Sequence, residues 1–363
     1  MTTFPPPSID QRIAATLQED SRRIPVVVGL CGAGRTSLLH RLAEAIGPEG
    51  AQYVNVERTA TTPERFLEAL TASSPFVDAG QAPRVISPRQ AFDAVLAYFT
   101  GAHRADEGPI TFLLDEVLEF RTFESFPGLR HSLPELLAVI AASPNRFVLT
   151  SRYPTRTERA LAGTSPQYSV VSMPALPPTE LSQMLAEAVG AREPRAAEDA
   201  GSGMDGLARL VAAVCGGRPS YARAIAGALH ANPSGAAGRD PMAMLVSALG
   251  PGASLWSQCA FDYEMRLHRA RGYGALKAIL EILSEQEPLT LTDVSQRMGR
   301  TPGSTKDYLS WLEDVDLVAV HRKRYRFRDP LLRLWVRLHC HSTPPTAELI
   351  DREVREFAEH CLT

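Results

Sequence analysis

A glycine-rich segment near the N-terminus, residues 29–37, has residue types and a spacing suited to holding phosphate groups. Gly29 and Gly34 occupy the two glycine positions of the pattern G-x-x-x-x-G-K-[ST], between an apolar stretch and the apolar-periodic segment SLLHRLAEAI. Gly32 and Ala33 are small, which lets backbone N–H groups wrap around a polyphosphate. A helix beginning directly after the loop directs the positive end of its dipole toward the same anion. The segment therefore predicts a P-loop.

The polar positions of this loop are Arg35, Thr36 and Ser37. In the phosphate-loop pattern, Thr36 supplies a hydroxyl ligand to Mg²⁺. Arginine stands where the pattern has lysine, and its planar fork is bulkier than an ammonium group and favours bidentate contacts. We expect the loop to bind a nucleotide with altered geometry, and whether it is an ATPase stays open. The alternative interpretation is a glycine-rich turn that binds no ligand.

Two further apolar stretches end in polar side chains. ITFLLDEV ends in Asp115 and Glu116, a pattern in which the aspartate holds Mg²⁺ and the next acid polarises an attacking water. RFVLTSR ends in Arg152, which we expect to contact a terminal phosphate. Ligands of open α/β folds bind at the carboxyl ends of strands, where both motifs would lie. The alternatives are ordinary acids at the end of a buried strand and a surface Arg152 paired with Glu158.

The elements that would position these residues alternate between strand and helix. Strands are expected at residues 24–28, 52–56, 110–114, 146–150 and 168–172, with helices at 36–46, 63–72, 88–103 and 133–142 and a loop at 73–87. This alternation predicts an α/β domain built on a parallel sheet.

Beyond residue 175 the strand pattern stops. A loop is expected at 192–206, a turn at 233–240, and helices at 204–215, 219–231, 240–249 and 253–271. Three helices at 274–285, 291–298 and 304–315 then precede the β-ribbon VAVHRKRYRFRD, which is the outline of a winged helix. The predicted domains are a lead-in (1–24), a P-loop nucleotide-binding domain (25–175), a helical lid (176–272), a winged helix (273–342) and a C-terminal helix (343–363).

The order of the three strand motifs resembles the STAND branch of AAA+ ATPases and the related archaeal-type and origin-recognition-like ATPases. CGGRPSYARAI resembles the GxP element of this family, at Gly217, Arg218 and Pro219. The resemblance implies ATP or ADP with Mg²⁺ as ligands, and a nucleotide-sensing role for Pro219 and for Arg218 or Arg223. The local alternative is a helix stop followed by proline at the next helix start. Arg35 departs from the family pattern.

The predicted wing, residues 321–328, is basic. Its candidate DNA contacts are Arg322, Lys323, Arg324 and Arg326, interleaved with aromatic residues. The preceding helix, STKDYLSWLEDVDLV, carries one lysine against four acids, which is unfavourable for contact with a polyanion. Two interpretations of the winged helix therefore stay open: DNA binding through the wing, and an internal or protein-docking role. Self-association or a protein partner of the chain also stays open.

The composition is that of an ordinary globular protein, with 44% hydrophobic residues, 22% charged residues and a net charge of −3. The five cysteines are scattered and form no CxxC pair, which argues against a disulfide framework or a zinc site. We find no apolar run long enough to span a membrane and no signal peptide, so we expect a cytoplasmic protein without a membrane partner.

Together these features predict an ATP-binding molecular switch of the STAND/AAA+ type, which couples nucleotide state to a winged helix and hydrolyses ATP weakly or slowly. One alternative is a DNA-binding regulator or initiator-like protein that uses its wing. The second is an adaptor whose degenerate P-loop binds no nucleotide.

Overall fold

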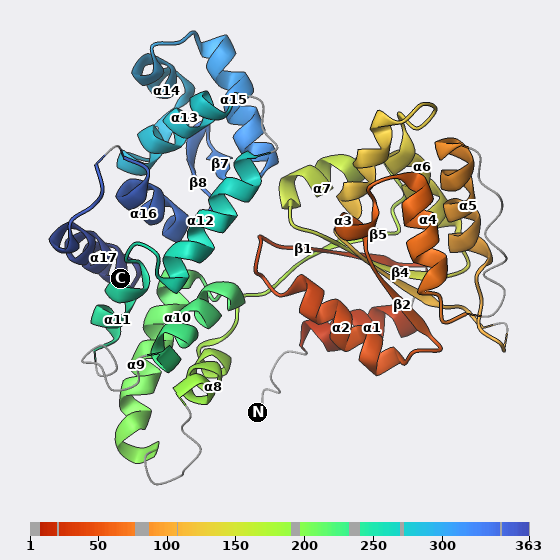
Figure 1. Cartoon of the computed structure of the whole chain (residues 1–363), viewed down its shortest axis with the longest axis horizontal. Coiled ribbons are helices and arrows are strands. Elements are labelled where there is room, and N and C mark those ends of the chain that lie inside the picture. Colours follow the sequence, from red (N-terminus) through yellow and green to blue (C-terminus); the bar gives the residue numbers. More distant parts are fainter. Residues whose placement is uncertain are drawn as a thin grey trace. The chain divides into compact units, whose positions relative to one another are not determined.

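The computed structural model describes residues 8–19, 22–76, 87–106, 108–189, 197–231, 240–268, 272–341 and 343–362. Contacts divide the chain into two compact units, residues 1–30 with 34–174, and residues 31–33 with 175–363 (Figure 1). The predicted loop at 73–87 and the predicted turn at 233–240 lie largely outside the described residues. No helix of the described chain is both long and apolar enough to cross a membrane.

The first unit is built on a five-stranded sheet in which every pair of neighbours is parallel, in the order β2-β3-β4-β1-β5. The strands are β1 (Ile24–Val28), β2 (Ala51–Asn55), β3 (Thr111–Asp115), β4 (Arg146–Ser151) and β5 (Tyr168–Ser172). The predicted parallel α/β sheet is confirmed, and each strand lies within one residue of its expected bounds. Every residue of β1 and β3 is buried, which explains why these strands are apolar runs without alternation.

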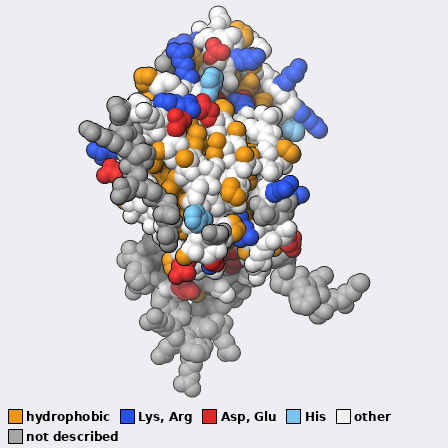
Figure 2. Space-filling model, turned by 90° about the vertical axis from the view of Figure 1, so that its right-hand side faces the viewer, with side chains coloured by type: hydrophobic (Ala, Val, Ile, Leu, Met, Phe, Trp, Pro, Cys, Tyr) orange, Lys and Arg blue, Asp and Glu red, His pale blue; other side chains and the backbone are white. Residues whose placement is uncertain are grey.

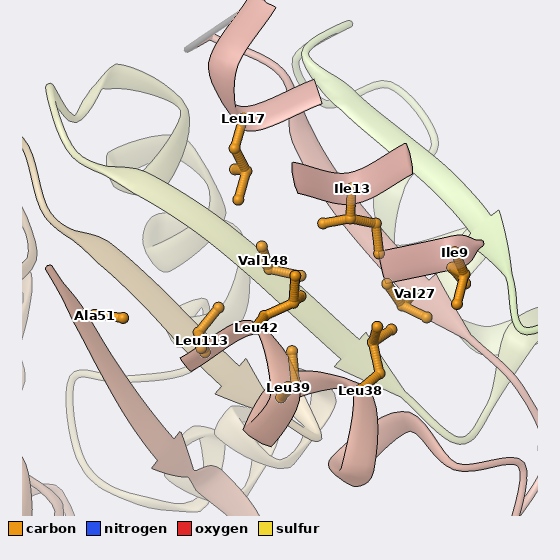
Figure 3. Close-up of a cluster of buried hydrophobic side chains, with 10 residues drawn as sticks. All are labelled: Ile9, Ile13, Leu17, Val27, Leu38, Leu39, Leu42, Ala51, Leu113 and Val148. Atoms are coloured by element: carbon orange, nitrogen blue, oxygen red, sulfur yellow. The ribbon is translucent and has the colours of Figure 1, made fainter. Parts of the chain in front are cut away.

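Helices cover both faces of this sheet. They are α1 (Ile9–Glu19), α2 (Arg35–Ile46), α3 (Val56–Thr59), α4 (Pro63–Ala72), α5 (Pro88–Gly101), the 3₁₀ helix η1 (Val117–Ser125), α6 (Ser132–Ala142) and α7 (Pro154–Leu161). Figure 3 shows leucines of α2 between α1 and the strands, where Leu38, Leu39 and Leu42 pack with Ile13 and Val27. Because the P-loop leads directly into α2, the packing of α2 on the sheet fixes the position of the loop.

The segment after β3 was not predicted as a helix. In η1, Phe120 and Phe123 are fully buried, and their rings lie 4.9 and 6.0 Å from that of Phe66 in α4. Phe120 and Phe123 therefore belong to the core. Figure 2 views the first unit from the side on which α5 lies, and hydrophobic side chains gather in the middle of this face.

The second unit begins with helices α8 (Pro178–Val189), α9 (Ala197–Cys215), α10 (Pro219–Ala231), α11 (Pro241–Ala248) and α12 (Ser254–Leu267). The expected loop at 192–206 is wrong from Ala197 onward, where α9 begins. Alanine, glutamate and methionine in AAEDAGSGMDG favour helix strongly enough to outweigh the three glycines.

The rest of this unit has the element order expected for a winged helix. Its elements are α13 (Tyr273–Glu285), β6 (Leu289–Thr290), α14 (Leu291–Met298), α15 (Pro302–Asp314), β7 (Val318–His321) and β8 (Arg324–Phe327), followed by α16 (Pro330–His339) and α17 (Ala347–Leu362). The strands form an antiparallel sheet in the order β6-β8-β7. Trp335 of α16 is 5% exposed, and its ring centroid lies 5.4 Å from that of Tyr263. The apolar stripe of α16 is therefore a packing surface.

Candidate functional site

The P-loop connects β1 to α2 and turns at two glycines. Gly32 and Gly34 have φ of 76° and 94°, in the left-handed region that residues with a Cβ rarely adopt. Gly34 is the N-cap residue of α2, so the loop leads directly to a helix N-terminus, where orphan N–H groups and the dipole favour an anion. The N–H of Gly29 donates to the carbonyl of Ser151 in β4, 3.3 Å away, which fixes the start of the loop. Ser37 is exposed in the first turn of α2.

The structure brings together the two residues predicted as magnesium ligands. The Thr36 hydroxyl donates to Oδ2 of Asp115 at 2.7 Å, although 79 residues separate them. Two further hydroxyls hold the same carboxylate: Thr150 Oγ1 donates to Oδ1 at 2.5 Å, and Tyr53 Oη donates to Oδ2 at 3.0 Å. Asp115 is 1% exposed, and donors from β2, β4 and α2 orient it at the carboxyl end of β3.

Tyr53 was not among the predicted site residues. Burial and the Asp115 charge raise the pKa of its hydroxyl to about 12, so the phenol stays protonated and can donate to the carboxylate. The ring of His40 lies 4.4 Å from the Tyr53 ring and supports its orientation. The only sequence signal that could have identified Tyr53 is its position near the carboxyl end of a predicted strand.

Glu116 is buried between two arginines. Arg35 Nη2 lies 2.5 Å from Oε1 of Glu116, while the backbone N–H and Nε of Arg152 lie 3.0 and 3.1 Å from Oε2. Burial acts to raise the pKa of the Glu116 carboxyl, but the two guanidinium charges outweigh it and hold the pKa below its ordinary value. Arg152, 8% exposed, also pairs with Glu57 at the start of α3. The alternative interpretation, in which Arg152 lies on the surface and pairs with Glu158, is therefore wrong.

The guanidinium of Arg35 also contacts the backbone of its own loop. Nη1 donates to the carbonyls of Gly29 and of Leu30, the latter at 2.8 Å, while Nη2 holds Glu116. The planar guanidinium thus connects the P-loop with Glu116, which follows β3. A lysine ammonium is a single point charge and lacks this fixed pair of donors.

The arginine of the GxP element is bonded within the second unit. Arg218 Nη1 lies 2.7 Å from Oδ2 of Asp329 and 3.7 Å from Oδ2 of Asp262. The Tyr221 hydroxyl donates to the same Asp329 oxygen at 2.6 Å, and Oδ1 of Asp329 accepts the first two free N–H groups of α16. Arg218 therefore connects the start of α10 to the start of the helix that follows the wing.

Pro219 is the first residue of α10, and Gly217 before it has φ of 64°. This geometry agrees with the local alternative for the GxP element, in which one helix stops and proline begins the next helix. Residues 31–33 of the P-loop, which include Ala33, belong to the second unit by their contacts. There the N–H of Ser220 donates to the carbonyl of Gly32 at 3.1 Å.

The hairpin of β7 and β8, which is the predicted wing, carries basic residues at its tip. Arg322 and Lys323 form the two-residue loop between β7 and β8, and both have positive φ, 49° and 62°. Such a turn normally selects Asn-Gly, because a left-handed backbone is unfavourable for residues with longer side chains. Arg324 and Arg326 follow on β8, and all four candidate residues are exposed. The sequence thus places two cations where local conformation disfavours them.

Replacing Arg322 by Asn and Lys323 by Gly is expected to stabilise the second unit by about 1 kcal/mol, because the left-handed turn would no longer be strained. Urea unfolding followed by tryptophan fluorescence measures this, since all three tryptophans, Trp256, Trp311 and Trp335, lie in the second unit. An unchanged or lower stability would contradict the strain argument.

No protein-family model and no curated protein matches the chain. Among solved structures, a Walker-type ATPase of Pyrococcus abyssi is 15% identical with a TM-score of 0.64, covering 90% of this chain and 94% of that chain. A STAND protein of Pyrococcus horikoshii with a tetratricopeptide repeat sensor is 15% identical (TM-score 0.32, 94% of this chain and 43% of that chain). Drosophila ORC bound to DNA is also 15% identical (TM-score 0.47, 98% and 89%). The parallel sheet, the loop between β1 and α2 and the likeness to the Pyrococcus abyssi protein show that the chain shares the fold of that Walker-type ATPase.

Proposed function

We propose that the chain is an ATP-binding molecular switch that hydrolyses ATP slowly or not at all. The observation that carries the proposal is the contact between Thr36 and Asp115 beside the N-terminus of α2. A hydroxyl and a carboxylate are oxygen ligands of the kind Mg²⁺ takes next to nucleotide phosphates. These two lie 79 residues apart in the sequence and meet at the loop whose glycines suit an anion.

The residues present fit a magnesium nucleotide. The backbone N–H groups of residues 30–36 would hold the phosphates, Thr36 and Asp115 would hold Mg²⁺, and Arg152 would lie toward the terminal phosphate. The metal, when bound, supplies positive charge that neutralises the phosphate oxygens. Glu116 is the candidate base, but both its oxygens face guanidinium groups and its pKa is lowered, which makes it a weak proton acceptor. This arrangement supports slow turnover.

Contacts inside the second unit support a role as a switch. Ser220 bonds the P-loop residue Gly32, and its neighbour Arg218 bonds Asp329 at the start of α16. A change at the P-loop could thus reach the helix that follows the wing through one turn of α10. Differential contacts in two nucleotide states are what a switch requires.

The proposal is tested by calorimetric titration of nucleotide-free protein with ATP and with ADP, in Mg²⁺ and in EDTA. We expect saturable binding of both nucleotides that weakens in EDTA. Absence of binding by the parent and by Arg35→Lys would contradict the proposal and favour an adaptor without nucleotide.

A second candidate function is DNA binding through the wing, and the strained Arg322-Lys323 turn favours it. Retention on duplex DNA at low salt, lost in a triple variant with glutamate at 322, 323 and 324, would support this function. The matched control places glutamate at Arg209, Arg223 and Arg352, three exposed residues of the same unit. Equal retention by both triple variants, or none by the parent, would contradict it.

A further inference from the structure

We propose that Arg35 has two alternative anionic partners, the Glu116 carboxylate and the phosphate of a bound nucleotide, so that Glu116 limits nucleotide affinity. When Arg35 contacts phosphate, it leaves Oε1 of Glu116. This inference rests on the proposed function, since it names how the same site is regulated.

The position of the guanidinium is the first argument. Arg35 occupies the lysine position of the P-loop pattern, yet its side chain bonds the carbonyls of Gly29 and Leu30 and the Glu116 carboxylate. Those partners hold both terminal nitrogens of the fork. These three contacts leave the Nε–H without a hydrogen-bond partner. The pair of terminal nitrogens, Nη1 and Nη2, must release a partner before it can bind a phosphate bidentately.

The second argument is that the two carboxylate oxygens of Glu116 have different partners. Oε1 is held by Arg35, whereas Oε2 accepts a hydrogen bond from the backbone N–H of Arg152 and lies 3.1 Å from its Nε in an ion pair. When Arg35 departs, Glu116 therefore keeps a cationic partner and is not left as an unpaired buried charge, which would be prohibitive. Glu57 in turn anchors Arg152. The transfer of Arg35 from Glu116 to phosphate therefore breaks one ion pair and leaves the other contacts of Glu116 and Arg152 in place.

Competition of this kind lowers apparent affinity, because only the fraction of molecules with Arg35 released can bind productively. Removing the competing carboxylate should restore the lost affinity. ADP is the probe of choice, because it has no γ-phosphate to be hydrolysed, and tighter binding cannot then arise from blocked turnover.

The experiment is a double-variant cycle with Mg²⁺–ADP, measured by calorimetry. Glu116→Gln in the parent is expected to tighten binding by about 5- to 100-fold. In an Arg35→Ala background the same change is expected to have little effect, because no arginine remains to be released. The matched control, Glu135→Gln, changes a half-buried carboxylate of the same unit that pairs with Arg89, and it should not change affinity in either background.

Simple repulsion between Glu116 and phosphate predicts an equal gain in both backgrounds, and that result would overturn the inference. So would no gain at all. Glu116→Asp is the second variant: it keeps the charge but shortens the side chain by one methylene, so competition predicts tighter ADP binding and repulsion does not. If the parent and every variant fail to bind ADP, the proposed function itself fails; if the parent binds and the cycle shows no coupling, only this inference fails.

Discussion

Replacing Arg218 by alanine is expected to destabilise the second unit by about 3–5 kcal/mol, the usual cost of removing one partner of a buried ion pair. The guanidinium lies beside Asp329 and Asp262, which are 3% and 0% exposed and which the buried charge of Arg266 also stabilises. Burial acts to raise the pKa of the Asp329 carboxyl, but Arg218 and the Tyr221 hydroxyl outweigh it and hold the pKa below its ordinary value. Without Arg218, Asp329 would be charged and poorly paired, and the N-cap of α16 would weaken.

Urea unfolding followed by tryptophan fluorescence reports this change, because every tryptophan lies in the second unit. Arg223→Ala is the matched control: it removes an exposed arginine from the same helix and should change stability by no more than about 0.5 kcal/mol. Equal effects of the two substitutions would show that Arg218 does not connect α10 to α16.

Replacing Asp115 by asparagine is expected to weaken Mg²⁺–nucleotide binding by at least about 10- to 100-fold, since changes even to the partners of metal ligands have effects of this size. Binding in EDTA should change little, because the phosphate loop itself is intact. The fold should survive, since the new amide oxygen can still accept from Thr150, and the hydroxyls of Thr36 and Tyr53 can rotate to accept from the amide NH2 group.

Tyr53→Phe provides the graded comparison for Asp115→Asn. It removes one of three hydroxyls from the carboxylate and keeps the ring against His40, so a smaller loss of Mg²⁺ dependence is expected. If Asp115→Asn retains the full difference between Mg²⁺ and EDTA, Asp115 is not a metal ligand.

The sequence was sufficient for features that depend on local pattern. Apolar runs located the five strands, and the spacing of Gly29, Gly34 and Thr36 located the P-loop. The approach of Thr36 to Asp115 followed from the rule that carboxyl ends of parallel strands share one edge of the sheet.

Features that depend on strand order or on precise side-chain direction could not be predicted. The pair Arg35–Glu116 spans 81 residues, and β4 lies between β1 and β3, so no spacing rule brings these side chains together. Arg218 and Asp329 are 111 residues apart on elements whose packing the sequence does not specify. In both cases a sequence motif identified the arginine, whereas the identity of its acidic partner depends on the tertiary structure.

Local rules also failed where other interactions outweighed them. The two-residue turn of the wing contains neither glycine nor asparagine, so its positive φ values gave no signal. The two-residue strand β6 is too short to produce an alternating pattern. The helix α9 begins inside a glycine-containing stretch that resembled a loop.

The measurement that tests the central claim most directly is hydrogen–deuterium exchange of the full chain with Mg²⁺–ADP and with a slowly hydrolysed ATP analogue in Mg²⁺. A nucleotide switch predicts that the two states differ in exchange at residues 29–37 and 146–152, and also at residues 216–222 and 329–333 of the second unit. Identical exchange in both states, at saturating ligand, would contradict the claim that the chain responds to the terminal phosphate.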